Sequence, residues 1–365
     1  MHIGQYGEKQ FIEAVLGQFA STACADSFDD AVAIDLAELT GDRAAGYLVY
    51  SMDQPSFVRH ADPGLDPFRF YGRWIAGTTC NDIIAMGARC RGFSLALAAP
   101  RETRVADLQS LMQGITDVLR VCGAKYEGGN FDSGDLGTVG FAWGLAPRQG
   151  IVRRGGARPG DVIAVTGQLG LGWLEYQLRT HDLADEIQPA DKQDFLDYKA
   201  MPIGAADAVA VAAQRGYLTS GMDLSDGLVE FLYTIKRRSN LGCVIDCAAL
   251  PVSRATRQNL HLLAGIIDAE AMSVLRRDPN LIALEAGYDS ALRHAFTLAP
   301  SDVAEATEIF KSRDAELHII GETTRETKVR VRREGLDTEI PEFWDDKLRQ
   351  ESILDAWNAF LKELS

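Results

Sequence analysis

The stretch that decides the fold is residues 222–228, which reads Met222-Asp223-Leu224-Ser225-Asp226-Gly227-Leu228. An apolar run precedes it and a helical pattern follows it to about residue 238, so the segment predicts a strand, a tight turn and a helix. The polar side chains in this turn have two interpretations. Asp223 and Ser225 cap the helix that begins near Gly227, or they contact a bound group.

Three other segments carry acids near the ends of expected strands or inside an expected helix. They read Ser27-Phe28-Asp29-Asp30-Ala31, Tyr50-Ser51-Met52-Asp53 and Asn81-Asp82-Ile83-Ile84-Ala85-Met86-Gly87-Ala88. Asp29 and Asp30 also suit a turn with a cap, and Asp53 also suits a surface position. Asp82 is harder to explain in this way, because a carboxylate buried in an apolar helix must be paired or given a metal.

These acids favour a magnesium site that holds phosphate. Carboxylates brought together repel one another unless cations lie between them. Mg²⁺ takes one or two carboxylates and completes its shell with water and substrate phosphates, which suits ATP. The run Glu127-Gly128-Gly129-Asn130 predicts a loop whose backbone N–H groups approach phosphate, although an ordinary turn uses the same residues.

Composition narrows the class of protein. The 365 residues are 46% apolar and 24% charged, which is typical of a globular chain of two domains. The net charge of -15 argues against a nucleic-acid partner, which needs a basic face. Six cysteines without a C-x-x-C pair predict reduced thiols and no zinc. We expect a cytoplasmic protein with no signal peptide and no membrane partner.

The chain divides near a segment rich in glycine, proline and arginine at 145–161, which predicts a solvated connection. We therefore expect domains at 1–148 and 149–335 and a helical tail at 336–365. In the first half we expect strands at 31–36, 47–52, 92–99 and 137–144 and helices at 9–20, 68–86 and 104–122. In the second half we expect strands at 162–166, 243–247, 316–320 and 328–332 and helices at 169–180, 203–215 and 346–364. The last helix is either a domain brace, the commoner case, or a partner site.

The order and spacing of these segments resemble thiamine-monophosphate kinase. The resemblance runs from about residue 7 to 250. Besides the acid-bearing segments and Gly128-Gly129, it rests on Gly7-Glu8, His60 seven residues after Asp53, the run from Arg154 to Asp161, Thr166 to Gly170, and Met201-Pro202. It places the chain in a superfamily with aminoimidazole ribonucleotide synthetase, selenophosphate synthetase and the hydrogenase-maturation dehydratase.

The resemblance implies an α/β N-terminal domain plus an α+β C-terminal domain, the two-domain architecture of aminoimidazole ribonucleotide synthetase. It also implies a homodimer joined through the N-terminal sheet, with ATP near the interface. The metal ligands it implies are Asp29, Asp30, Asp53, Asp82, Asp223 and Asp226. Asp82, Asp223 and Asp226 are the candidate catalytic residues. The residues it places near the nucleotide are Gly128, Gly129, Asn130 and Ser225.

Two further roles stay open. Arg154 is a candidate phosphate contact, since a guanidinium forks onto phosphate, or it is a solvated linker charge. His60 faces the acceptor or is a surface histidine.

The sequence departs from the kinase pattern in three places. Met52 replaces a threonine, Asn130 replaces an aspartate, and the acceptor segment Gly-Gly-Glu-Asp-Tyr-Glu-Leu is absent, the nearest run being residues 285–290. The nucleotide half is thus retained and the acceptor half rebuilt. We expect an ATP- and Mg²⁺-dependent phosphotransferase acting on a small-molecule acceptor. The alternatives are an ATP-dependent synthetase or dehydratase of the same superfamily, or a nucleotide-binding regulator without turnover.

Overall fold

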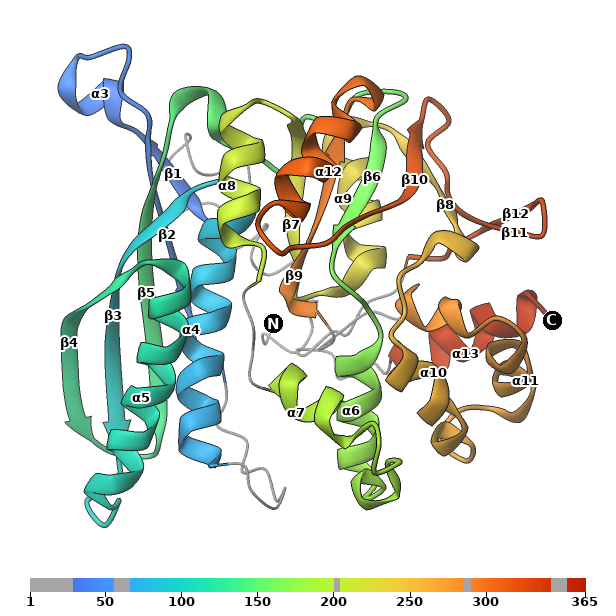
Figure 1. Ribbon diagram of the computed structural model, residues 1–365, viewed down its shortest axis with the longest axis horizontal. Helices are drawn as coiled ribbons and strands as arrows, with labels where there is room; N and C mark the ends of the chain where they lie inside the picture. Colours follow the sequence, from blue (N-terminus) through green and yellow to red (C-terminus); the bar gives the residue numbers. More distant parts are fainter. Residues whose placement is uncertain (1–28, 56–65, 200–203, 285–289, 343–352) are drawn as a thin grey trace, which may run out of the picture.

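Two mixed sheets form the body of the protein (Figure 1). The computed structural model describes residues 29–55, 66–199, 204–284, 290–342 and 353–365. The first sheet has the strand order β1-β2-β5-β3-β4, and the second has the order β12-β11-β8-β10-β6-β9-β7. The expected α/β and α+β architecture is confirmed.

The first sheet is covered on one face by two long helices. Its elements are β1 (Val32–Asp35), α3 (Leu36–Thr40), β2 (Tyr47–Asp53), α4 (Pro67–Ala85), β3 (Arg89–Ala99), α5 (Val105–Cys122), β4 (Lys125–Ser133) and β5 (Gly137–Ala146). Asp66 caps α4 by accepting the N–H groups of its first turn, and Gly123 ends α5 in a left-handed conformation. The two helices pack closely because a Cβ on Gly72 would lie 1.9 Å from the Leu111 carbonyl oxygen.

The second half contains the larger sheet and most of the shorter helices. Its strands are β6 (Val162–Thr166), β7 (Leu218–Leu224), β8 (Gly242–Asp246), β9 (Ser290–Leu298), β10 (Leu317–Thr324), β11 (Val329–Arg333) and β12 (Leu336–Glu339). Its α-helices are α6 (Leu171–Thr180), α7 (Lys192–Lys199), α8 (Ala206–Gln214), α9 (Gly227–Ser239), α10 (Arg254–Asn259), α11 (Ala269–Arg277), α12 (Val303–Lys311) and α13 (Ile353–Glu363). Helices α6, α7, α10, α11 and α13 gather at one end of this sheet (Figure 1).

Three strands differ from the sequence expectation, and one of them, β12, pairs with β11 where a helical tail was expected from residue 336. Residues 128–130, expected in a phosphate-binding loop, lie within β4, which pairs with β3 in parallel. Strand β9 was not expected, yet it lies between β6 and β7 inside the second sheet. Arg293 and His294 interrupt its apolar run, so the segment lacks the alternation that marks a strand.

The C-terminal helix α13 packs on its own chain, as expected for a domain brace. Trp357 is fully buried, and its ring meets that of Trp173 edge-on with the centroids 5.2 Å apart. Phe360 and Leu361 enter the same core.

The connection between the sheets is not a free solvated linker. The Val152 N–H donates to the carbonyl of Met86 at the end of α4. The Arg153 carbonyl accepts the Gly221 N–H, and the Arg154 carbonyl accepts the Ser220 hydroxyl, both from β7. The segment thus brings the end of α4 next to β7. The functional roles assigned to residues 1–148, 149–335 and 336–365 stay predictions.

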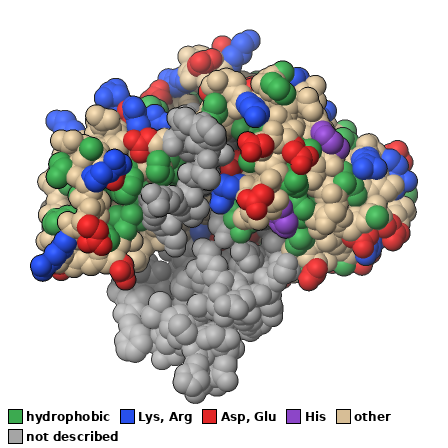
Figure 2. All heavy atoms as spheres, turned by 90° about the horizontal axis from the view of Figure 1, so that it is seen from below, with side chains coloured by type: hydrophobic (Ala, Val, Ile, Leu, Met, Phe, Trp, Pro, Cys, Tyr) green, Lys and Arg blue, Asp and Glu red, His purple; other side chains and the backbone are tan. Residues whose placement is uncertain are grey.

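The surface carries both signs of charge. On the face seen in Figure 2, acidic and basic side chains are interspersed with hydrophobic ones over the described residues. None of the helices that the structure describes is long and apolar enough to cross a membrane.

Candidate active site

Two aspartates from different halves of the chain meet where α4 approaches β7. Asp82 lies in the last turn of α4, and its Oδ2 accepts a hydrogen bond from Ser51 Oγ of β2 at 2.5 Å. Asp223 lies in β7, where it accepts from Ser225 Oγ at 3.1 Å and from Asn81 Nδ2 at 3.4 Å. We call Asp82 and Asp223 the acid pair.

Both carboxyl groups of the acid pair have raised pKa values. Burial of the carboxyl raises the pKa of Asp82 well above its usual value, and the negative charges of Asp223 and Asp30 raise it further. Burial likewise raises the pKa of Asp223. The negative charge of Asp30 raises this pKa further, whereas the positive charge of Arg154 lowers it. Among the described residues neither member of the pair has an ion-pair partner within 4 Å. The arrangement therefore favours a bound proton or a bound cation.

Beside the acid pair lie two aspartates that are already paired. Asp29 accepts hydrogen bonds from Arg153 Nη1 at 2.7 Å and from the Arg154 N–H at 2.9 Å. Asp30 accepts from Arg154 Nε at 2.8 Å and from the Asp223 N–H at 3.1 Å. We call Asp29, Asp30, Arg153 and Arg154 the Asp–Arg cluster. Arg154, expected as a phosphate contact or a linker charge, is bonded here to Asp30.

Asp53 and Asp226 lie at the edge of the acid pair. Asp53 ends β2, is partly exposed, and adds to the rise in the pKa of Asp82. Asp226 precedes α9, is exposed, and adds to the rise in the pKa of Asp223. The structure thus brings Asp30, Asp53 and Asp226 within electrostatic reach of one or both members of the acid pair. No three His, Cys, Asp or Glu residues of the described chain are close enough together to hold an ion unaided.

The glycine segment lies away from the acids. Three strand spacings separate β4 from β2, so Gly128, Gly129 and Asn130 are about 14 Å from β2 within one chain. The expected loop at these residues is wrong, because they form an edge strand. His60 lies outside the described residues.

Sequence reasoning did not include three side chains that lie beside the acid pair. Ser51 and Asn81 contact the acid pair, and their place beside Met52 and Asp82 in the quoted motifs was the available signal. His294 is opposite Asp223 in the β7–β9 register and is fully buried. Burial lowers the pKa of His294 to about 3, so this imidazole is neutral. No sequence pattern pointed to it.

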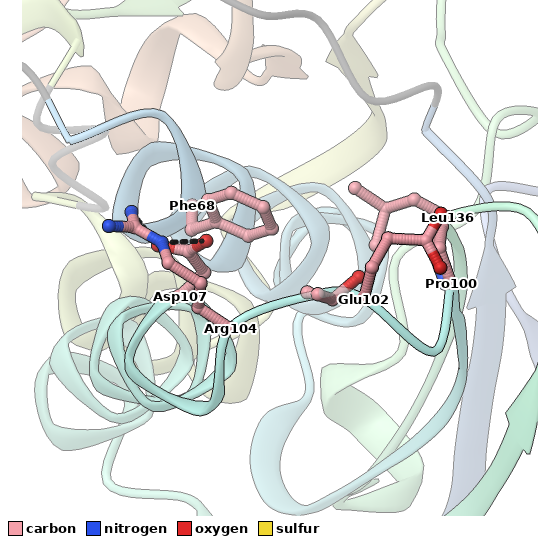
Figure 3. A pocket seen from close by; sticks show the side chains of 7 residues that line it. Phe68, Pro100, Glu102, Arg104, Asp107 and Leu136 are labelled. Atoms are coloured by element: carbon pink, nitrogen blue, oxygen red, sulfur yellow. Dashed lines mark hydrogen bonds and ion pairs between the residues drawn. The ribbon is translucent and has the colours of Figure 1, made fainter.

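A separate pocket lies at the other end of α4. It has a volume of about 380 Å³ and is lined by Phe68, Pro100, Glu102, Thr103, Arg104, Asp107 and Leu136. Figure 3 shows Arg104 and Asp107 joined by an ion pair on one side and Leu136 on the other. Fourteen residues of α4 separate Phe68 from Asp82, which is about 21 Å along the helix axis. The pocket is therefore not part of the acid site.

Family models of known proteins match most of the chain. The N-terminal domain of AIR synthase related proteins matches residues 28–146, and their C-terminal domain matches residues 158–334. The thiamine-monophosphate kinase of Synechococcus elongatus is 30% identical over 255 residues, which are 64% of this chain and 75% of that protein.

Solved structures show the same fold. The thiamine monophosphate kinase of Aquifex aeolicus superposes with a TM-score of 0.68 at 20% identity, covering 93% of this chain and 99% of that chain. A structure of AaThiL complexed with AMPPCP and TMP gives a TM-score of 0.67 at 20% identity, covering 93% and 98%. The chain therefore belongs to the AIR synthase related proteins and, within them, to the thiamine-monophosphate kinases, which are ATP-dependent kinases.

Proposed function

We propose that the chain is an ATP- and Mg²⁺-dependent kinase that transfers the γ-phosphoryl group of ATP to a small anionic or polar metabolite. The single observation that carries this proposal is the acid pair. Asp82 and Asp223 come from the two halves of the chain, and neither takes part in an ion pair within the part of the chain that the structure describes. Such a pair fits a divalent cation that also binds phosphate oxygens.

The donor set also fits magnesium in kind. Asp82 and Asp223 supply carboxylate oxygens, and the charges of Asp53 and Asp226 act on them from nearby. Mg²⁺ is usually bound by one or two protein carboxylates, and water and phosphate oxygens take its remaining coordination positions. When bound, the ion would neutralise charge on the phosphates. Ser51 and Asn81 would orient the two carboxylates, and Asp82, Asp223 and Asp226 are the proposed catalytic residues.

We also propose a homodimer formed through the first sheet. Helices α4 and α5 cover one face of this sheet, while the opposite face presents the cross-strand neighbours Met52 and Phe141. Met52 is 64% exposed, and Leu145 on the same face is 40% exposed. An exposed apolar sheet face is typical of an interface. Light scattering on the chain and on a Phe141→Asp variant tests this proposal, and an unchanged monomeric mass in both would contradict it.

A dimer would also account for the remaining nucleotide contacts. Gly128, Gly129 and Asn130 are too far from the acid pair within one chain, but a second copy joined through the sheet could bring its β4 to the nucleotide. Ser225 lies beside Asp223 and would contact the nucleotide from the same chain. His60 is the candidate residue facing the acceptor. The cytoplasmic location stays a prediction.

The acceptor is the least constrained part of the proposal. Thiamine monophosphate is one candidate, because the similar proteins are named for it. Phosphorus NMR of ATP, Mg²⁺ and the purified protein, with thiamine monophosphate or with a pool of metabolites, tests the reaction. We expect ADP and a new phosphoester or phosphoanhydride resonance. Free phosphate that depends on a co-substrate would favour the synthetase or dehydratase alternative, and no ATP loss with any mixture would contradict a kinase.

A further inference from the structure

Three cysteines of the first half gather where α4, β3 and α5 come together. Cys80 lies near the end of α4, Cys90 near the start of β3, and Cys122 is the last residue of α5. The Cys90 thiol donates to the carbonyl oxygen of Cys80 at 3.6 Å. The Cys122 thiol is hydrogen-bonded to both other thiols. We call these residues the thiol cluster, and all three are free thiols in the structure.

The members of the thiol cluster differ in their access to solvent. Cys80 is fully buried and Cys90 is 3% exposed, whereas Cys122 is partly exposed at the end of its helix. Hydrogen bonds from Cys80 and Cys90 lower the pKa of Cys122, although burial opposes them. The thiolate is the form of cysteine that reacts with peroxides. Cys122 is therefore both the most accessible and the most reactive member of the cluster.

Of the two buried thiols, Cys80 is the better partner for Cys122. The hydrogen bond from Cys80 contributes most to the lowered pKa of Cys122, and the Cys90 thiol is already bonded to a backbone carbonyl. Helices α4 and α5, which carry Cys80 and Cys122, also pack against each other. A thiol in contact with an oxidised cysteine sulfur is placed to form a disulfide with it.

The cysteines of the second half provide a contrast. Cys243 lies in β8 and Cys247 directly after it, and both are buried. Burial raises the pKa of Cys243 to about 12 and that of Cys247 to about 11. Both therefore stay protonated near neutral pH and react slowly with peroxides.

The thiol cluster adjoins the acid pair. Cys80 directly precedes Asn81 and Asp82 on α4, and the charge of Asp82 acts on the Cys90 thiol. A covalent bond holds two sulfur atoms closer than a hydrogen bond does, so a disulfide between Cys80 and Cys122 must shift the ends of α4 and α5. The helix backbones already touch at Gly72, so the shift falls on the end of α4 that carries Asp82.

We propose that Cys122 and Cys80 form an oxidation site, at which a peroxide links α5 to α4 through a disulfide and thereby weakens metal binding at the acid pair. The Cys122 thiolate attacks a peroxide oxygen, the O–O bond breaks, and a sulfenic acid and water result. The Cys80 sulfur then attacks the sulfenic sulfur, the S–O bond breaks and a second water leaves. Two thiols are oxidised and one hydrogen peroxide is reduced to two waters. The effect on metal binding, but not the disulfide itself, rests on the proposed function.

The first test maps the disulfide. The full chain is treated with hydrogen peroxide, the remaining thiols are alkylated, and the digested peptides are identified by mass spectrometry. We expect a linked pair of peptides that carry Cys80 and Cys122, while Cys243 and Cys247 stay open to alkylation after unfolding. Cys122→Ser should lose the linked pair, and the matched control Cys247→Ser should keep it.

The second test measures metal binding. Mn²⁺ is titrated into the reduced and the oxidised chain, and the free ion is followed by electron paramagnetic resonance. We expect oxidation to weaken Mn²⁺ binding about tenfold, the size of effect that contacts behind a ligand usually have. Dithiothreitol should restore the affinity, and because it does not reduce methionine sulfoxide, the recovery assigns the effect to the disulfide. Cys122→Ser should bind Mn²⁺ equally well before and after peroxide.

Two results would overturn the inference. One is a chain in which Cys122 forms no disulfide or is linked to a cysteine other than Cys80. The other is an unchanged Mn²⁺ affinity in a chain whose Cys80–Cys122 disulfide has been mapped. Should Cys122→Ser fail to fold, peptide mapping of the natural chain with and without dithiothreitol decides the same question. Absence of Mn²⁺ binding by the reduced chain would instead contradict the proposed function, and the peptide map would still decide whether the disulfide forms.

Discussion

We expect substitutions of Asp30 and Arg154 to have strongly non-additive effects on the free energy of unfolding. Asp30 is 1% exposed and accepts from the Arg154 guanidinium, whose side chain is 24% exposed. Removing one partner of a buried ion pair costs about 3–5 kcal/mol, because the other charge stays buried and unpaired. Since Arg154 retains some contact with water, we expect Asp30→Asn and Arg154→Met each to lower the free energy of unfolding by about 3 kcal/mol.

The double variant should cost much less than the sum of the single variants. Replacing both charges removes the desolvation penalty together with the attraction, so we expect a total loss of about 3 kcal/mol instead of about 6. Urea denaturation in the presence of EDTA, followed by tryptophan fluorescence, measures the three losses. Additivity within about 0.5 kcal/mol would refute the reasoning, because it would mean that the two side chains do not interact.

Three further outcomes are expected. Ser51→Ala removes the hydrogen bond to Asp82 and should weaken Mn²⁺ binding about 10- to 100-fold with little loss of stability, as calorimetric titration would measure. Trp357→Ala should lower the free energy of unfolding by about 4 kcal/mol, whereas exposed Leu336→Ala should change it by less than about 0.5, both measured by urea denaturation. Without metal, a raised pKa of Asp82 means that the folded chain binds the proton more tightly than the unfolded chain. Stability should therefore fall as the pH rises through that pKa, and Asp82→Asn should flatten this fall in denaturation curves recorded over a pH series.

The sequence predicted the architecture well where its patterns were strong. The helices expected at 104–122 and 68–86 appear as α5 and α4. Strand β9 was missed because a strand buried on both faces shows no alternation of polar and apolar residues. Arg293 and His294 also divide its apolar residues into two short runs. The register that places His294 opposite Asp223 is a tertiary fact that no local pattern contains.

The sequence predicted which acids lie near one another better than it predicted the contacts that each of them makes. The sequence grouped Asp82, Asp223 and Asp30 as one set of acids, and the structure does bring them within electrostatic reach. Arg153 and Arg154 lie in a segment that the sequence predicts to be a solvated connection. The sequence could not show that these arginines form ion pairs with Asp29 and Asp30. That separation of paired from unpaired acids depends on contacts more than 100 residues apart in the chain.

The central claim is that Asp82 and Asp223 hold the metal of an ATP-dependent kinase. Transfer of radiolabelled γ-phosphate from ATP to an acceptor in the presence of Mg²⁺ tests it most directly, with Asp82→Asn, Asp223→Asn and the control Asp185→Asn compared at equal folded concentration. The account predicts that both acid-pair variants lose turnover while Asp185→Asn retains it. Full turnover in either acid-pair variant would contradict the account.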